Sequence, residues 1–66
     1  MITVNEAQIE YQPDMLLAQA LTKAAVDMEA HMLITVDGVF ADKNNAGRIV
    51  INDGAEICVM PILSGG

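Results

Sequence analysis

The shortness of the chain is the feature that most limits its possible folds. With 66 residues, it can form one small domain, which buries only ~60% of the surface that the unfolded chain exposes. Because 53% of the residues are hydrophobic, one compact core is feasible, but a deep substrate cleft would use residues that this core needs. The length therefore favours a binding or carrier module over a self-sufficient enzyme.

The charge of the chain argues against a nucleic-acid binder. Nine acidic residues oppose three basic residues, so the formal net charge is −6. A protein that binds a phosphate backbone needs clustered Lys and Arg, whereas Lys23, Lys43 and Arg48 are scattered. The acidity either serves solubility alone or also steers the domain toward the basic surface of a protein partner.

The sequence has no recognisable signal peptide or membrane segment. No charged segment followed by an apolar stretch opens the chain, and no run approaches the ~18 apolar residues of a membrane helix. The single cysteine, Cys58, cannot form an internal disulfide. We therefore expect a soluble cytoplasmic protein that binds neither membranes nor nucleic acid.

The N-terminal residues predict a β-hairpin and then a helix. Residues 1–5 and 8–11 alternate apolar and polar side chains, as strands do, and the residues between them allow a turn. Pro13 ends this hairpin, and Asp14 is placed to cap a helix over residues 15–28. The apolar face of this helix is expected to consist of Leu17, Leu21, Ala24, Ala25 and Met28.

The middle of the chain predicts a second hairpin. Residues 32–36 form a strongly apolar run, which suits an inner strand. Asp37-Gly38 favours a two-residue turn, because a type I′ turn needs positive φ angles and Gly adopts them readily. Residues 39–41 would return as a short strand, and the polar residues 42–47 would form a surface loop.

A last strand completes the predicted fold. Apolar side chains alternate over residues 56–60, and Pro61 suits the end of that strand because proline has no N–H group. The order of elements predicts an α+β ubiquitin-like β-grasp, a mixed sheet of four to five strands with one main helix packed on one face. The last strand would pair beside the first. We expect a domain over residues 1–61 and a flexible C-terminal tail over residues 62–66.

The end of the tail, Ser64-Gly65-Gly66, is the strongest candidate for chemistry. Residues without a Cβ make a thread thin enough for a narrow active site, and four extended residues reach at most ~14 Å. The carboxylate of Gly66 is open to attack on ATP, and a sulfur nucleophile would convert the resulting acyl-adenylate into a thiocarboxylate. A pair of glycines is also typical of a frayed chain end.

Apolar residues just before the glycines are candidates for partner binding. They are Met60, Ile62 and Leu63, and Ser64 follows them. Either some of these side chains complete the core, or the sheet face that stays exposed docks on partner proteins. The sequence leaves both interpretations open.

Two lone side chains are weaker candidates for a site. Cys58 lies in a predicted strand, where burial as a small hydrophobic residue is favoured over a role as a sulfur-relay thiol. His31 has no second His or clustered Cys near it in the sequence, so we expect no metal site. It is expected at a junction between helix and strand.

Several segments, spread in order over the whole chain, are typical of one known family. They are Met1-Ile2-Thr3-Val4-Asn5, Gln12-Pro13-Asp14, Val36-Asp37-Gly38-Val39, Asn52-Asp53-Gly54 and the terminal Gly65-Gly66. With these segments the chain resembles the ThiS/MoaD family of sulfur carriers, most closely the carrier of the thiamine pathway (ThiS type). The resemblance implies a β-grasp fold and a terminal glycine that is adenylated and then thiocarboxylated.

The resemblance also implies a set of partners. An activating enzyme related to ubiquitin-activating enzymes (E1-like) would consume ATP, a sulfur donor protein would supply sulfur, and thiazole synthase would accept it. The chain would then be a protein co-substrate without a bound cofactor, and not an enzyme. Gly66 would carry the sulfur, while Gly65 and Ser64 would keep the chain end narrow and long enough to enter an active site.

Residues before the tail leave the pathway open. The ending Met60-Pro61-Ile62-Leu63-Ser64-Gly65-Gly66, with its proline, resembles the small subunit of molybdopterin synthase, for which the large subunit would be the partner. In addition, Ala55 stands where carriers of the thiamine pathway commonly have Asp. A ubiquitin-like modifier that forms isopeptide bonds with lysines shares the same fold and tail.

Overall fold

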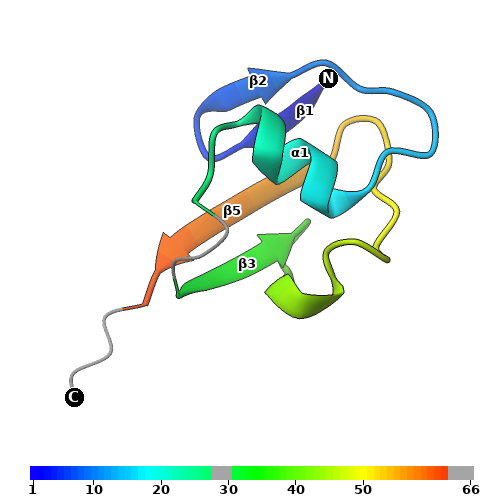
Figure 1. Cartoon of the computed structure of the whole chain (residues 1–66). Helices are drawn as coiled ribbons and strands as arrows, with labels where there is room; N and C mark the ends of the chain where they lie inside the picture. Colours follow the sequence, from blue (N-terminus) through cyan, green and yellow to red (C-terminus); the bar gives the residue numbers. More distant parts are fainter. Residues whose placement is uncertain (28–30, 63–66) are drawn as a thin grey trace.

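The computed structural model describes residues 1–27 and 31–62, and it has the α+β architecture that the sequence predicts (Figure 1). The strands are β1 (Ile2–Val4), β2 (Ala7–Ile9), β3 (Met32–Val36), β4 (Val39–Ala41) and β5 (Glu56–Pro61). The helices are α1 (Leu17–Lys23) and the short 3-10 helix η1 (Lys43–Asn45). In this described part of the chain, neither helix has the length and apolar character needed to cross a membrane.

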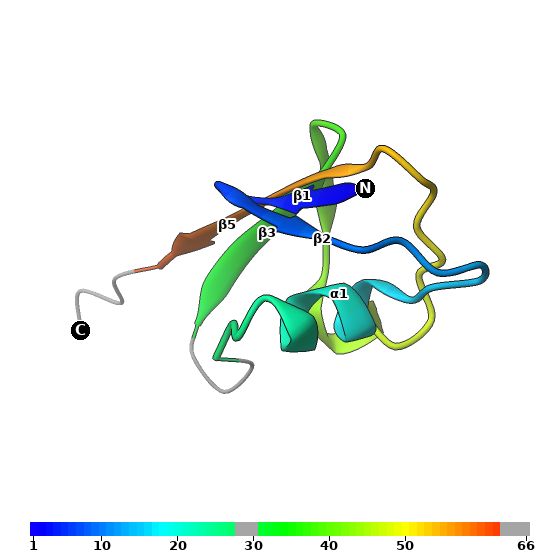
Figure 2. The same cartoon turned by 90° about the horizontal axis from the view of Figure 1, so that it is seen from above.

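The strands form one mixed sheet in the order β2-β1-β5-β3-β4. β5 is parallel to β1 and antiparallel to β3, and each outer strand is antiparallel to its hairpin partner. The last strand therefore lies beside the first, as predicted, and it also joins the two hairpins into one sheet. Helix α1 covers one face of this sheet, which gives the predicted β-grasp (Figure 2).

The core lies between the sheet and α1. Alternation along β1 points Ile2 and Val4 toward the helix, and alternation along β5 does the same for Ile57. Loop residues close the ends of this layer. The buried set consists of Ile2, Val4, Ile9, Met15, Leu17, Ala20, Leu21, Ile34, Ala46, Ile51, Ala55 and Ile57. The predicted inward faces of the first and last strands are thus confirmed.

The start of α1 differs from the prediction, because Asp14 does not cap the helix. Asp14 lies in a turn with a φ of 60°, and the helix begins at Leu17. The N–H group of Leu17 donates to the carbonyl of Ile49 at 2.8 Å, and that of Ala18 donates to the carbonyl of Ala46 at 3.0 Å. Backbone carbonyls from a distant loop therefore accept the first N–H groups of α1, which were expected to bind the side chain of Asp14.

The end of α1 also differs from the prediction, because the helix stops at Lys23. The N–H of Ala25 donates to Thr22 and the N–H of Val26 donates to Leu21, which together form a Schellman motif. Ala25 has a φ of 60° at the position where such motifs usually have Gly. It is exposed, so it does not extend the apolar face. The predicted end of the helix at Met28 lies outside the described residues.

The strain at Ala25 leads to a stability prediction. We expect Ala25→Gly to raise the free energy of unfolding by about 0.5–1 kcal/mol, because Gly adopts a positive φ without a Cβ clash. Ala24→Gly is the matched control: its φ is −83°, so there the greater chain entropy of Gly lowers stability by about 0.5–1 kcal/mol. Urea unfolding of both variants measures the two effects. Shifts of the same sign would show that the conformation of Ala25 carries no strain.

The predicted turn at Asp37-Gly38 is confirmed. Asp37 and Gly38 have φ angles of 52° and 84°, as a type I′ turn requires, and Val36 pairs with Val39 across them. Gly54, in the turn before β5, has a φ of 86°. The loop over residues 42–47 holds η1 and buries Ala46, although its remaining residues are polar or exposed.

An ion pair joins the N-terminal amine to the turn before β5. The amine of Met1 lies 2.6 Å from Oδ1 of Asp53, and the N–H of Gly54 donates to the carbonyl of Met1 at 3.0 Å. The hydrogen bond from the amine, followed by its positive charge, lowers the pKa of the Asp53 carboxyl below its ordinary value of 3.8. Because both groups are 65% exposed, the pair contributes little to the stability of the fold.

Candidate functional site

Two of the predicted partner-binding residues lie together at the end of β5. Met60 is 51% exposed and Ile62 is 49% exposed. These two side chains therefore do not belong to the core. Leu63, Ser64, Gly65 and Gly66 lie outside the described residues.

Among the described residues, no helix covers the face of the sheet opposite α1 (Figure 2), and exposed apolar side chains lie on it. Alternation along β5 puts Cys58 and Met60 on this face, and Ile62 continues the alternation. Leu33 lies opposite Met60, while Thr35 lies between Cys58 and Phe40. We call this group the open-face patch; it consists of Leu33, Phe40, Cys58, Met60 and Ile62.

Leu33 and Phe40 are site residues that were not predicted from the sequence. The apolar run over residues 32–36 suggests a strand buried on both faces, and β3 is indeed an inner strand. However, the sheet has only one covered face, so Leu33 stays 36% exposed and Phe40 71% exposed. The Asp37-Gly38 turn was the available signal, because it sets the register that puts Phe40 opposite Thr35.

The expectation that Cys58 is a buried hydrophobic residue is wrong. Its two neighbours in β5, Ile57 and Val59, face α1, so Cys58 points to the uncovered side and is exposed. It lies directly opposite Thr35 of β3. Cys58 is therefore a solvent-accessible member of the open-face patch.

The charged groups at the start of β5 are acidic. Alternation puts Glu56 on the same face as Cys58, and Oδ1 of Asp37 accepts the N–H of Glu56 at 2.9 Å. The three basic residues of the chain lie outside the strands, at Lys23, Lys43 and Arg48. An apolar patch with acidic groups at one end suits a protein partner that has an apolar centre and a basic rim.

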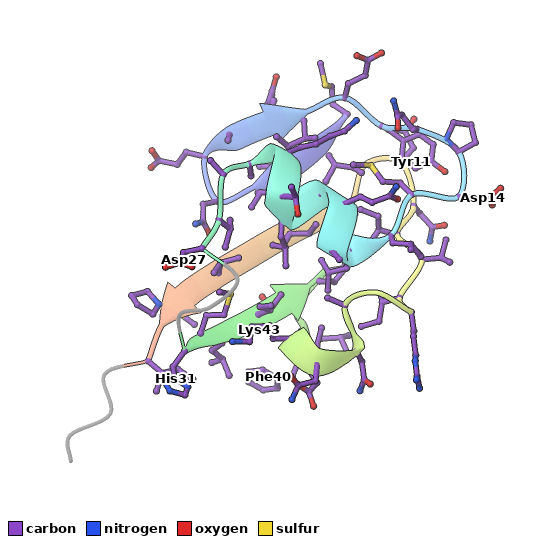
Figure 3. The ribbon with its side chains drawn as sticks, in the orientation of Figure 1. Tyr11, Asp14, Asp27, His31, Phe40 and Lys43 are labelled. Atoms are coloured by element: carbon purple, nitrogen blue, oxygen red, sulfur yellow. The ribbon has the colours of Figure 1, made fainter. Side chains whose placement is uncertain are left out.

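A shallow groove of about 240 Å³ lies beside the end of β5. Its lining consists of Asn5, Val26, Asp27, His31, Met32, Val59 and Pro61. Figure 3 shows His31 beside the tip of β5, in the predicted connection that leads into β3. Across residues 1–27 and 31–62, no three His, Cys, Asp or Glu side chains are grouped as a metal site requires.

Within residues 1–27 and 31–62, the end of β5 has a neighbouring strand on one side only. β1 pairs with β5 as far as Ile57, whereas β3 pairs with it as far as Pro61. Beyond the strand, the N–H of Ile62 donates to the carbonyl of His31 at 3.1 Å. Backbone bonding to the β3 side therefore holds the chain up to the last described residue.

Comparison with known proteins adds no relative: no protein-family model matches the sequence, and no curated protein matches it. Support for a function therefore comes from the fold, the open-face patch and the residues that follow β5.

Proposed function

We propose that the chain is a sulfur carrier whose Gly66 carboxylate is first adenylated and then thiocarboxylated. The observation that supports this most strongly is the position of β5, the central strand of a β-grasp sheet. β5 runs past the end of β1 and brings Ile62 to one end of the sheet, next to an exposed apolar face. Three small residues, Ser64-Gly65-Gly66, follow within a few positions.

The proposed chemistry uses only the carboxylate of the chain. A carboxylate oxygen of Gly66 attacks the α-phosphorus of ATP, and pyrophosphate leaves as the acyl-adenylate forms. A sulfur nucleophile at the oxidation level of sulfide then attacks the carbonyl carbon, and AMP leaves. The product is a thiocarboxylate, whose sulfur can pass to an acceptor. The carrier is thus a co-substrate, and an E1-like activating enzyme supplies the ATP site.

The open-face patch supplies the docking surface in this proposal. An exposed apolar surface that lies beside the reactive segment lets a partner bind the domain and the segment together. The same surface would meet the activating enzyme first and the acceptor, thiazole synthase, afterwards. Both partners are cytoplasmic proteins in this proposal.

The decisive experiment is intact-mass spectrometry after incubation with ATP, the activating enzyme and a sulfur donor protein. We expect the mass increase that corresponds to replacement of one oxygen by sulfur, and fragmentation should assign it to Gly66. The same mixture without ATP is the control and should leave the mass unchanged. If no ATP-dependent increase maps to Gly66, the proposed function is wrong.

Pro61 favours one alternative, a small subunit of a molybdopterin-synthase-like enzyme. Pro61 ends β5 opposite Met32 of β3, and the ending of the chain that contains it resembles the ending of that subunit. In this case the segment after β5 would enter a larger subunit and supply sulfur there. Complementation of thiamine and molybdenum-cofactor auxotrophs separates the two: rescue of only the latter would favour the subunit.

The docking role of the patch leads to a prediction about Met60. We expect Met60→Lys to raise the KM of the activating enzyme for the carrier about tenfold or more, because it removes an apolar contact and opposes a basic rim. Stability should change little, since Met60 is 51% exposed. Val50→Lys is the matched control, because Val50 is 58% exposed but lies in the loop that contacts Leu16. Equal KM values for both variants would exclude the patch from docking.

A further inference from the structure

Asn5 continues the pairing of β5 where β1 stops. Its backbone N–H donates to the carbonyl of Ile57 at 2.8 Å. Its side-chain Oδ1 then accepts the N–H of Val59, also at 2.8 Å. The side-chain oxygen therefore accepts the hydrogen bond that the backbone carbonyl of Asn5 would accept if β1 continued in the regular parallel ladder.

The position demands two properties that few residues combine. Asn5 has a φ of 55°, in the left-handed region that Asn and Asp adopt far more readily than most residues. It also needs a short side chain that carries an acceptor. Gly meets the first requirement but not the second, and Asp meets both.

The hydrogen bond that Asn5 accepts from Val59 satisfies the last backbone donor on one edge of β5. Along the part of β5 that extends past β1, Val59 donates to Asn5 and Pro61 has no N–H group. This edge therefore has no free backbone donor with which to pair a further strand. The bond also adds a third partner to a two-stranded ribbon, which otherwise twists more strongly than a wider sheet. Both effects fix the direction of β5 just before Ile62.

We infer that Asn5 is a positioning residue for the C-terminal segment: by holding the N–H of Val59, it sets the line along which the chain leaves β5 toward the glycines. This inference rests on the proposed function, because the direction matters only if Gly66 must enter the active site of another protein. A carrier whose segment points elsewhere is not competent to bind, so the apparent affinity for the partner falls with the competent fraction of carriers.

The first test compares Asn5→Gly with Asn5→Asp in the activation reaction. Asn5→Gly keeps the positive φ but lacks the acceptor, so fewer carriers present the segment correctly. We expect the KM for the carrier to rise about three- to tenfold, the effect of one net hydrogen bond, with kcat unchanged. Asn5→Asp keeps the acceptor, so its KM should remain close to that of the chain without substitutions. Since Asp27 lines the same groove, the assay is run at physiological ionic strength to screen the added charge.

A stability control separates positioning from simple support of the fold. Ala24→Gly is expected to lower stability without touching β5, so its KM should stay unchanged. If Ala24→Gly and Asn5→Gly raise KM equally, Asn5 acts only through stability and the positioning role is overturned.

The second test, amide hydrogen exchange, measures the hydrogen bond without any enzyme. In the unmodified chain the Val59 amide should be protected, and in Asn5→Gly its exchange should become about three- to tenfold faster. The amide of Cys58 faces β3 and should not change, which makes it an internal control. An unprotected Val59 amide in the unmodified chain would overturn the inference without any variant.

The two proposals fail in different ways. If the unmodified carrier forms no thiocarboxylate, the proposed function is wrong and the positioning role falls with it, whatever the exchange data show. If the carrier without substitutions does form the thiocarboxylate and Asn5→Gly loses protection at the Val59 amide, but the KM for Asn5→Gly equals that for the carrier without substitutions, only the positioning role is wrong.

Discussion

A carrier extended by one alanine after Gly66 is expected to lose thiocarboxylate formation almost completely while keeping its fold. The extension turns the Gly66 carboxylate into an amide, and the new carboxylate lies ~3.5 Å further along the chain beside a Cβ. Displacement of a reacting group by even about 1 Å can cost about 100-fold in rate. We therefore expect at least that loss in the ATP-dependent mass increase, measured as an initial rate.

A second variant tests whether the missing Cβ matters at the same place. Gly66→Ala keeps the length of the chain but widens its end, so we expect a large loss there as well. Gly47→Ala is the matched control, because a Cβ at Gly47 meets no atom within 4 Å. It should be modified at the normal rate. An extended carrier that still gains sulfur would show that the reactive group is not the carboxylate of Gly66.

The largest effect on stability is expected from Ile57→Ala. Ile57 is 1% exposed and pairs with both Val4 of β1 and Val36 of β3. Removing a buried side chain of this kind costs about 2–5 kcal/mol. A domain of this size has only about 3–10 kcal/mol of stability in total. The variant should therefore lose much of its cooperative unfolding transition in urea.

The matched control for Ile57→Ala is Val39→Ala, at a β4 position that is 68% exposed. We expect this change to cost no more than about 0.5 kcal/mol, as is usual for surface positions. Similar midpoint shifts for the two variants would contradict a core centred on β5.

The fold could be predicted from the sequence because its decisive signals are local. Asp37-Gly38 sets one hairpin, and alternation around residues 2–4 and 56–60 sets the inward faces of two strands. The bounds of α1 could not be predicted for the opposite reason. Its first donors bind the carbonyls of Ile49 and Ala46, which are distant in sequence. It ends at Lys23, and the positive φ that follows is at Ala25, where the sequence has no glycine to mark the stop.

The candidate site was predictable in part. The apolar run near the end of the sequence predicted a role for Met60, and Met60 is exposed in the structure. The exposure of Leu33, Phe40 and Cys58 depends on which face of the sheet α1 covers. That is decided by tertiary packing and not by local sequence. Asn5 reads as a turn residue in the sequence, and only the register of β1 against β5 brings its side chain to Val59.

The central place of β5 also affects how the protein is made. A ribosome synthesises β5 after the other strands, so until residue 61 is added the two hairpins have no strand between them and their apolar faces remain in water. We therefore expect folding in one cooperative step once β5 is available. A translation product that stops before residue 56 lacks the middle of the sheet and not merely an edge. Such products should remain unfolded and be open to proteases, so the folded population consists of chains synthesised nearly as far as the glycines.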